Sequence, residues 1–212
     1  MDRTKNTINV FNKYAQAYNE KYMDVSLYKP SLKIFCKTLK KKNPEILELA
    51  CGPGNLTKYI LEQRPDFKIT ATDLSPNMLE IAKSNNPSIQ VEKLDCRELN
   101  SLNRTFDAIV CGFGLPYLSK EEVVHLIEGV RLALHQNGLC YLSIMEADFS
   151  KSGIKKSSNG EDELYIYYHQ GEFIEKALRD NKLKAIHTAR LTNPLEQEIT
   201  SKDLVIIAQK TD

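Results

Sequence analysis

Two glycines separated by one residue stand in the segment Glu48-Leu-Ala-Cys-Gly-Pro-Gly-Asn55, directly after an apolar run. Because glycine has no Cβ, Gly52 and Gly54 allow a sharp turn and a close approach of the backbone to a ligand. The turn would join a strand to a helix, and ligands bind at the carboxyl ends of strands in open α/β sheets. A turn that merely connects the two elements could use the same glycines, so the motif needs support from elsewhere in the chain.

A carboxylate in the next expected strand gives that support. Asp73 lies 19 residues beyond Gly54, at the end of a largely apolar segment. At that position it can accept hydrogen bonds from both hydroxyls of a ribose. The alternative is that Asp73 begins a loop or caps the following helix. Its spacing from the glycine turn favours a bound nucleoside.

The same turn argues against a dinucleotide. A G-x-G-x-x-G motif needs a third glycine for tight packing of the helix on the strand, but Thr57 holds that position here. Pro53, between the two glycines, has no N–H to donate to a phosphate. The turn therefore suits a nucleoside without a pyrophosphate group.

The elements that must position these residues alternate between apolar runs of strand length and amphipathic stretches of helical length, which is typical of α/β proteins. Ser75, before Pro76, is expected to cap one helix. Ser119 begins a capping-box sequence, and its helix is expected to end at Asn137-Gly138. A short polar connection between the last two strands favours an antiparallel pair. The expected strands are residues 45–50, 67–73, 89–95, 106–112, 139–145, 183–191 and 203–209.

Together these features resemble the class I methyltransferases that use S-adenosylmethionine, whose first motif is an acidic residue followed by a G-x-G turn, as in ELACGPGN. The resemblance extends over residues 11–210. It implies an α/β fold with three Rossmann-like layers around a mixed sheet, mostly parallel with an antiparallel C-terminal edge strand. It also implies S-adenosyl-L-methionine as the cofactor and methyl transfer as the reaction.

The resemblance assigns roles around the cofactor. Glu48 would orient the turn around the methionyl group, Asp73 would hold the ribose, and Asp95 would accept a hydrogen bond from the adenine amine. Taken alone, Asp95 fits an ordinary loop acid equally well. The N-terminal tyrosines would close over the cofactor, and a stripe that packs on the domain is the alternative. The implied cofactor-binding residues are Tyr14, Tyr18, Glu48, Ala50, Gly52, Gly54, Asn55, Asp73, Leu74, Met78, Asp95, Cys96, Gly112 and Phe113.

Signals for the methyl acceptor are weaker. We predict Tyr117 and His169 as catalytic residues that could take a proton from a hydroxyl or amine acceptor. A fixed base is not always required, because much of the catalysis can come from orientation. The segment ending in Tyr117 lacks the Asn or Asp before Pro-Pro-Tyr of enzymes that methylate amines in nucleic acids. A small molecule is therefore the expected acceptor, and nucleic acid is disfavoured as a partner.

Composition sets outer bounds on the function. The 212 residues carry 29 Lys and Arg against 28 Asp and Glu, a net charge of +1 that favours neither polyanions nor anionic membranes. No apolar run approaches the ~20 residues of a membrane span, and the N-terminus lacks the apolar region of a secretory signal. Five scattered cysteines without zinc-site spacing predict reduced thiols, a cytoplasmic location and no metal site.

We expect a single methyltransferase domain over residues 1–212. It would comprise an N-terminal helical cap at 1–43, a cofactor-binding core at 44–147, a lid at 148–170, and a C-terminal helix with edge strands at 171–212. Two other functions stay open: an NAD-dependent oxidoreductase, and a non-catalytic module that binds the cofactor. The acceptor, the methylated atom and the oligomeric state have no recognisable sequence signature.

Overall fold

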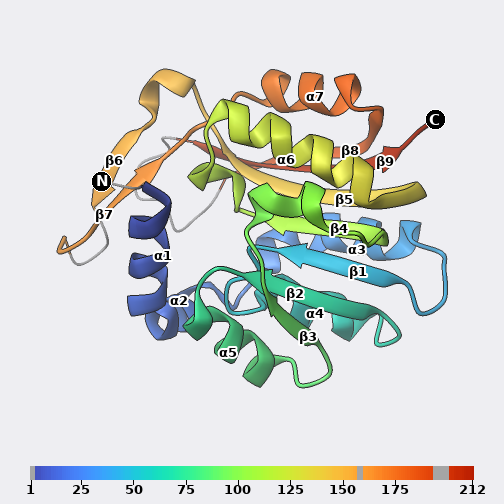
Figure 1. The fold of residues 1–212 in the computed structure, drawn as a ribbon, viewed down its shortest axis with the longest axis horizontal. Helices are drawn as coiled ribbons and strands as arrows, with labels where there is room; N and C mark the ends of the chain where they lie inside the picture. The colour runs from blue at the N-terminus through green and yellow to red at the C-terminus, as the bar shows by residue number, and fades with distance from the viewer. Residues whose placement is uncertain (1–2, 157–159, 193–200) are drawn as a thin grey trace.

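The computed structural model describes residues 3–156, 160–192 and 201–212. Among these residues, seven strands form one sheet in the order β3-β2-β1-β4-β5-β9-β8 (Figure 1). The strands from β3 to β5 are parallel, whereas β9 runs antiparallel to both β5 and the outermost strand β8. The predicted α/β fold with a mostly parallel sheet is confirmed, and its antiparallel strand lies within the C-terminal edge pair. The strands are β1 (Glu45–Leu49), β2 (Lys68–Asp73), β3 (Gln90–Lys93), β4 (Phe106–Gly112), β5 (Leu134–Glu146), β8 (Leu183–Leu191) and β9 (Lys202–Lys210).

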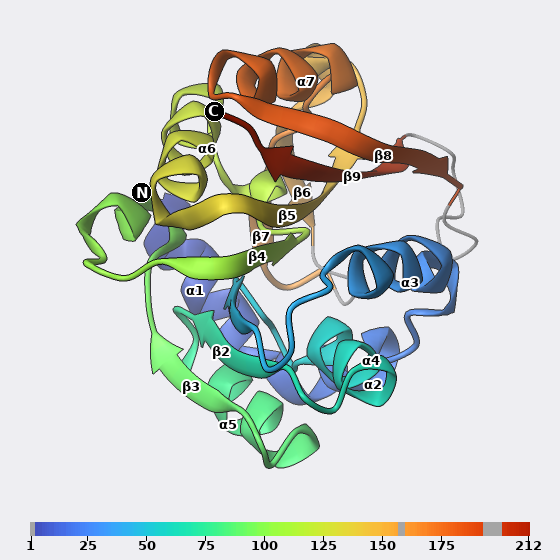
Figure 2. The ribbon, with the colours of Figure 1, turned by 90° about the vertical axis from the view of Figure 1, so that its right-hand side faces the viewer.

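Helices cover both faces of this sheet (Figure 2). On one face lie α6 (Lys120–Ala133) and α7 (Gly171–Asp180). On the other lie α3 (Lys29–Thr38), α4 (Asn55–Gln63) and α5 (Pro76–Asn85). All residues of β4 except the last are buried. Burial on both faces explains why this strand, apart from Asp107, is apolar throughout rather than alternating.

The predicted starts of two helices are confirmed, but the predicted end of one of them is not. Ser75 caps α5 by accepting a hydrogen bond from the Met78 amide, and Ser119 forms the predicted capping box at the start of α6. The prediction that this helix continues to Asn137-Gly138 is wrong, because α6 ends at Ala133. Leu134 is already buried in β5, where it pairs with Phe106. The strand pairing thus overrides the helical spacing of Leu134.

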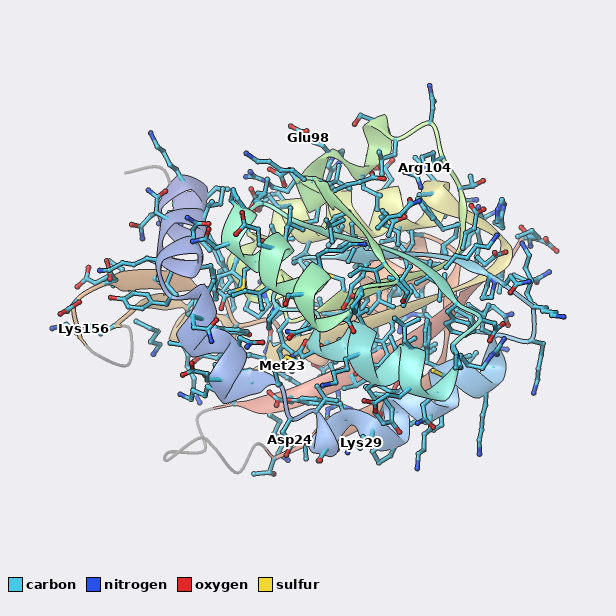
Figure 3. All side chains as sticks on the ribbon, turned by 90° about the horizontal axis from the view of Figure 1, so that it is seen from below. Met23, Asp24, Lys29, Glu98, Arg104 and Lys156 are labelled. Carbon is cyan, nitrogen blue, oxygen red and sulfur yellow. The ribbon has the colours of Figure 1, made fainter. Side chains whose placement is uncertain are left out.

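Two N-terminal helices and a hairpin lie together at one end of the sheet (Figure 1). The helices are α1 (Arg3–Lys13) and α2 (Ala15–Tyr22), and the hairpin joins β6 (Gly153–Lys156) to β7 (Glu163–Ile166). Met23, Asp24 and Lys29 mark the connection from α2 to the 3-10 helix η1 (Ser26–Tyr28) and α3 (Figure 3).

The hairpin lies within residues 148–170, the segment that the sequence predicts as a lid. A short 3-10 helix, η4 (Phe149–Lys151), precedes it, and residues 153–156 pair with residues 163–166. The pairing was hidden because β6 has little apolar character and its Ile154 is 64% exposed. The polar connection expected between the last two strands contains Asn193-Pro194, which lies outside the described residues. No described helix is long and apolar enough to cross a membrane.

Candidate functional site

The glycine turn after β1 contains three residues in the left-handed region of φ. They are Ala50 (φ 49°), Gly52 (φ 53°) and Gly54 (φ 77°). A Cβ on Gly54 would lie 2.5 Å from Asn86 Nδ2, so this position requires glycine. A Cβ on Gly52 would meet only Tyr18 Cε1, at 3.9 Å, among the described residues. The backbone at Gly52 is therefore accessible from the side on which Tyr18 lies, as a ligand site requires.

Asp73 ends β2 beside this turn. Its Oδ2 accepts a hydrogen bond from the Gly52 amide at 3.0 Å, and its Oδ1 accepts one from the Ser75 amide at 2.9 Å. Burial raises the pKa of Asp73, whereas the two amides act in the opposite direction. The carboxylate is thus fixed between the glycine turn and the start of α5.

One pocket brings the predicted residues together at the carboxyl ends of the parallel strands. Ala50 follows β1, Asp73 ends β2, Asp95 follows β3 and Gly112 ends β4. Phe113, next to Gly112, has a φ of 56°, which is strained for a residue with a side chain. The predicted residues that line the pocket are Tyr18, Ala50, Gly52, Asp73, Leu74, Met78, Asp95, Cys96, Gly112, Phe113 and Tyr117.

An aromatic wall closes the pocket on the N-terminal side. The Phe11 ring makes edge-to-face contacts with Tyr18, at 5.6 Å between centroids, and with Tyr117, at 5.1 Å. Such contacts stabilise the pairs beyond the area that they bury. The wall joins α1 and α2 to η3 (Leu115–Tyr117), the 3-10 helix that follows β4.

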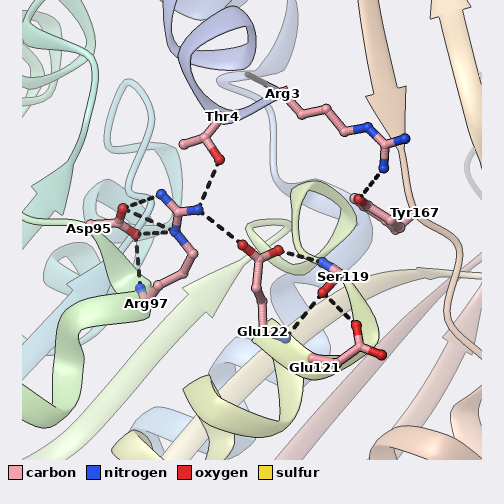
Figure 4. A network of polar contacts seen from close by, with 8 residues as sticks. All are labelled: Arg3, Thr4, Asp95, Arg97, Ser119, Glu121, Glu122 and Tyr167. Carbon is pink, nitrogen blue, oxygen red and sulfur yellow. Dashed lines mark hydrogen bonds and ion pairs between the residues drawn. The ribbon is translucent and has the colours of Figure 1, made fainter. Parts of the chain in front are cut away.

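A polar network borders the pocket beside Asp95 (Figure 4). Arg97 binds both oxygens of Asp95 and also donates to Thr4 of α1, at 2.9 Å, and to Glu122 of α6, at 3.0 Å. Burial raises the pKa of Asp95, but the hydrogen bonds from Arg97 outweigh it, so the pKa lies below its usual range. Asp95 is therefore an ionised hydrogen-bond acceptor at the pocket wall.

Residues 46–138 match the family profile described as a methyltransferase domain. These residues are a methyltransferase domain. They contain the glycine turn, Asp73, Asp95 and Gly112, which are the positions on which the resemblance to class I methyltransferases depends. That prediction is confirmed.

The chain matches only part of the length of its curated relatives. The chain is 38% identical over 72 residues to the malonyl-[acyl-carrier protein] O-methyltransferase of Acetivibrio thermocellus, covering 33% of this chain and 25% of that protein. It is 28% identical over 151 residues to the release factor glutamine methyltransferase of Streptococcus pneumoniae, covering 65% and 50%. The chain thus matches between a quarter and a half of these two relatives.

Solved structures share the fold across nearly the whole chain. An S-adenosylmethionine-dependent methyltransferase from Clostridium acetobutylicum has a TM-score of 0.72 at 20% identity, covering 96% of this chain and all of the other. Magnesium protoporphyrin IX methyltransferase from Synechocystis, with bound S-adenosylmethionine, has a TM-score of 0.75 at 14% identity, covering 100% and 98%. The methyltransferase domain and its N-terminal and C-terminal extensions therefore follow a known arrangement.

Four of the predicted cofactor residues do not line the pocket of the methyltransferase domain. Glu48 is buried behind the turn, where it accepts a hydrogen bond from Thr57. Gly54 is the N-cap residue before α4, and Asn55 donates to the Tyr22 carbonyl at 2.8 Å, which joins α4 to α2. The Tyr14 hydroxyl donates to Asp162 near the hairpin, at 2.6 Å. These residues support the pocket from outside its lining.

The two predicted catalytic residues are separated. Tyr117 lines the pocket, and burial raises its pKa far above the usual range. His169 is fully buried and is not among the residues that line the pocket. Its Nε2 lies 3.2 Å from the Leu115 carbonyl oxygen and 3.1 Å from that of Leu118, so it donates to the first residue of η3 and to the residue that follows η3. The structure therefore places His169 as a support for the segment that carries Tyr117.

Several pocket residues were missed from the sequence. Thr4, Thr7, Ile8 and Phe11 project from α1 into the pocket, with the spacing of one helical face. That periodicity was a usable signal, since the tyrosine stripe beginning at Tyr14 continues it. Leu94, Arg97, Gly114 and Leu118 carry no local signal, because only the fold brings them to the pocket.

Proposed function

We propose that this protein transfers the methyl group of S-adenosylmethionine to a small-molecule acceptor. One observation carries the proposal: the accessible backbone of Gly52 and the carboxylate of Asp73 are hydrogen-bonded to each other and line the same pocket. A nucleoside needs both features, a close backbone approach and an acceptor for ribose hydroxyls.

The residues present fit this cofactor. Asp73 would accept hydrogen bonds from the ribose, and the backbone at Gly52 would approach the methionyl group. Leu74, Met78 and Leu118 line the pocket and offer apolar surface to the adenine ring. When bound, S-adenosylmethionine supplies a methyl group on a positively charged sulfur, from which a nucleophile can take it in line.

The chain itself contributes orientation and exclusion of water. The aromatic wall of Phe11, Tyr18 and Tyr117 closes the pocket, which favours a fixed approach of the acceptor. A tyrosine phenol is protonated at neutral pH, and burial raises the pKa of Tyr117 further, so Tyr117 serves as a hydrogen-bond donor rather than as a base. His169 would act through η3 and not on the acceptor. Catalysis without a strong base follows from this arrangement.

A small acceptor is the proposal that the neighbours support best. One solved neighbour is a 1,6-didemethyltoxoflavin-N1-methyltransferase of Burkholderia thailandensis with that compound bound, similar in fold with a TM-score of 0.74. The curated relatives are named for different acceptors, so none of their substrates is favoured for this chain. The near-neutral charge of the chain gives no support to nucleic acid.

We also propose a cytoplasmic location. All five cysteines are free, and four of them are buried. Buried free thiols are typical of proteins kept in reducing compartments. The comparison of fractionated cells by immunodetection tests this part separately from the activity.

Titration calorimetry with S-adenosylhomocysteine and with NAD tests the cofactor. We expect binding of the first and none of the second, and the reverse result would establish the oxidoreductase alternative. Labelled S-adenosylmethionine, incubated with the protein and a small-molecule extract, then tests transfer. Labelled product is expected in the small-molecule fraction. Binding of the cofactor without any labelled product across broad extracts would favour the non-catalytic module.

A further inference from the structure

Arg97 stands at the meeting point of three elements that border one end of the pocket. It lies in η2 (Cys96–Ser101), directly after Asp95 and Cys96, which line the pocket. Its guanidinium reaches α1 through Thr4 and α6 through Glu122 (Figure 4). Glu122 in turn accepts a hydrogen bond from the Ser119 amide at 2.7 Å, next to the pocket residue Leu118. The side chain of Arg97 therefore links three elements: the residues from Asp95 to η2, the helix α1, and the start of α6.

The contact between Arg97 and Asp95 fixes the orientation of the carboxylate. Nε lies 3.0 Å from Oδ1 and Nη2 lies 2.5 Å from Oδ2, which is a two-point contact. Oδ1 also accepts a hydrogen bond from the Arg97 amide at 3.0 Å. The side chains are 29% exposed for Arg97 and 15% for Asp95. Nε is shared with Oδ2, at 3.1 Å, so Arg97 occupies most of the acceptor positions of the carboxylate and leaves Oδ2 a fixed direction in which to accept from a ligand.

The charges leave this carboxylate able to bind a donor. One guanidinium faces two carboxylates, Asp95 and Glu122, so the cluster keeps a net negative charge. Asp95 is ionised and can only accept hydrogen bonds. A ligand amine placed against it gains a charge-assisted hydrogen bond, whereas a carbonyl oxygen at the same place is repelled.

We propose that Arg97 is the positioning residue for nucleobase selectivity: it holds the Asp95 carboxylate so that the pocket accepts the adenine amine and rejects a carbonyl oxygen. The inference rests on the proposed cofactor and adds the residue on which recognition of its base depends. Thr4 gives Arg97 a second effect, because the same guanidinium holds α1 over the pocket.

The decisive variant is Arg97→Lys, which keeps the charge but loses the two-point fork. The readout is the ratio of dissociation constants for S-inosylhomocysteine and S-adenosylhomocysteine. The inosine compound has a carbonyl oxygen in place of the amine and, with it, an N1–H in place of the N1 acceptor. We expect the natural chain to prefer the adenine compound on the order of tenfold or more. In Arg97→Lys the ratio should fall at least about fivefold, mainly through weaker binding of the adenine compound.

Arg104→Lys is the matched control. Arg104 pairs with Glu92 on the surface, 45% exposed and outside the pocket lining (Figure 3). Its substitution should leave the ratio unchanged. Thermal unfolding of both variants reports whether either substitution disturbs the fold.

Two further variants separate the effects of Arg97. Asp95→Asn should also bring the ratio of dissociation constants close to one. The Asn amide can turn its oxygen towards the adenine amine or its NH2 towards the carbonyl oxygen of the inosine compound. Thr4→Val removes the partner on α1 and should speed the release of both ligands while leaving the ratio intact.

The outcomes separate this inference from the proposed function. Absence of S-adenosylhomocysteine binding in the natural chain would overturn the proposed function itself. Binding without a preference for the amine, or an equal loss of both ligands in Arg97→Lys, would overturn the role of Arg97 while leaving the cofactor in place. A ratio that falls in Arg97→Lys but not in Arg104→Lys supports the role of Arg97 in positioning Asp95.

Discussion

The carboxylate of Asp73 and the backbone amide of Gly52 are joined by a hydrogen bond of 3.0 Å. This bond fixes the end of β2 to the turn after β1, so the two parts of the proposed nucleoside site hold each other in place. A ligand that binds both would find them already oriented, which lowers the entropic cost of binding.

Replacement of Asp73 by Ala should therefore weaken binding of S-adenosylhomocysteine by about 10- to 150-fold, or about 1.5 to 3 kcal/mol, because a charged acceptor of hydrogen bonds is lost. Titration calorimetry on the folded variant gives the value. Asp180→Ala is the control, since Asp180 pairs with Lys176 on the exposed side of α7. Equal affinities in the Asp73 variant and the natural chain would contradict the proposed ribose contact.

Replacement of Gly54 by Ala should destabilise the protein. The position has a φ of 77°, and the added Cβ would lie 2.5 Å from Asn86 Nδ2 and 3.3 Å from Ala82. The left-handed conformation alone costs about 1 to 2 kcal/mol for a residue with a side chain. Thermal unfolding should show a fall of at least about 2 to 4 °C. Gly153→Ala is the control, because no described atom lies within 4 Å of the place that its Cβ would occupy; similar melting temperatures for both variants would contradict the argument.

Local rules explain which parts of the site were predictable. The glycine turn and Asp73 are placed by strand ends and by backbone conformation, which neighbouring residues determine. The helix starts at Ser75 and Ser119 likewise depend on contacts within three residues. For the same reason the sequence led to the correct fold and to most of the pocket lining.

Tertiary contacts explain the rest. His169 carries no partner at a diagnostic spacing, and its two carbonyl partners lie more than 50 residues earlier. Arg97 reaches the pocket only because Asp95, Thr4 and Glu122 converge on it. The helix α6 ends earlier than predicted because Leu134 pairs with Phe106 in the sheet. Periodicity within one segment contains none of this information.

Glu48→Gln should change how stability depends on pH. Burial raises the pKa of Glu48 to about 7 in the folded protein, from an ordinary value near 4.5. Below about pH 4.5 the carboxyl is protonated in both states. As pH rises from there towards 7, Glu48 ionises first in the unfolded chain, so the natural protein loses stability relative to the Gln variant. Above pH 7 the total loss in the free energy of unfolding should be on the order of 3 kcal/mol.

Urea unfolding at pH 5, 6, 7 and 8 measures this difference. The Gln side chain can still accept the hydrogen bond from Thr57, so packing is preserved. The advantage of the Gln variant should grow between pH 5 and 7 and then level off. A difference that stays constant over this range would show that Glu48 ionises normally in the folded state.

His169→Leu and His169→Gln should separate support of η3 from proton transfer. Leu leaves the carbonyls of Leu115 and Leu118 without their donor, which should cost about 1 to 3 kcal/mol of stability. Gln can supply an N–H and should restore most of it. Burial lowers the pKa of His169, so the imidazole is neutral near pH 7 and the pH profile of methyl transfer should not change in the Gln variant. A loss of turnover on the order of 100-fold or more in a stable Gln variant would instead identify His169 as a base.

Asp162→Asn should loosen the N-terminal helices over the pocket. Asp162 Oδ2 lies 2.7 Å from Lys13 Nζ and accepts a hydrogen bond from the Tyr14 hydroxyl, so it joins the end of α1 to the segment before β7. We expect S-adenosylhomocysteine to associate and dissociate severalfold faster in the variant, with little change in affinity, because opening becomes easier in both directions. Stopped-flow fluorescence competition measures both rates. Salt should speed exchange in the natural chain more than in the variant, since the variant keeps only the longer ion pair of Lys13 with Glu161, at 3.8 Å, to be screened. Asp180→Asn, which removes an exposed pair on α7, should leave the rates alone, and an identical acceleration in that control would exclude a specific role for Asp162.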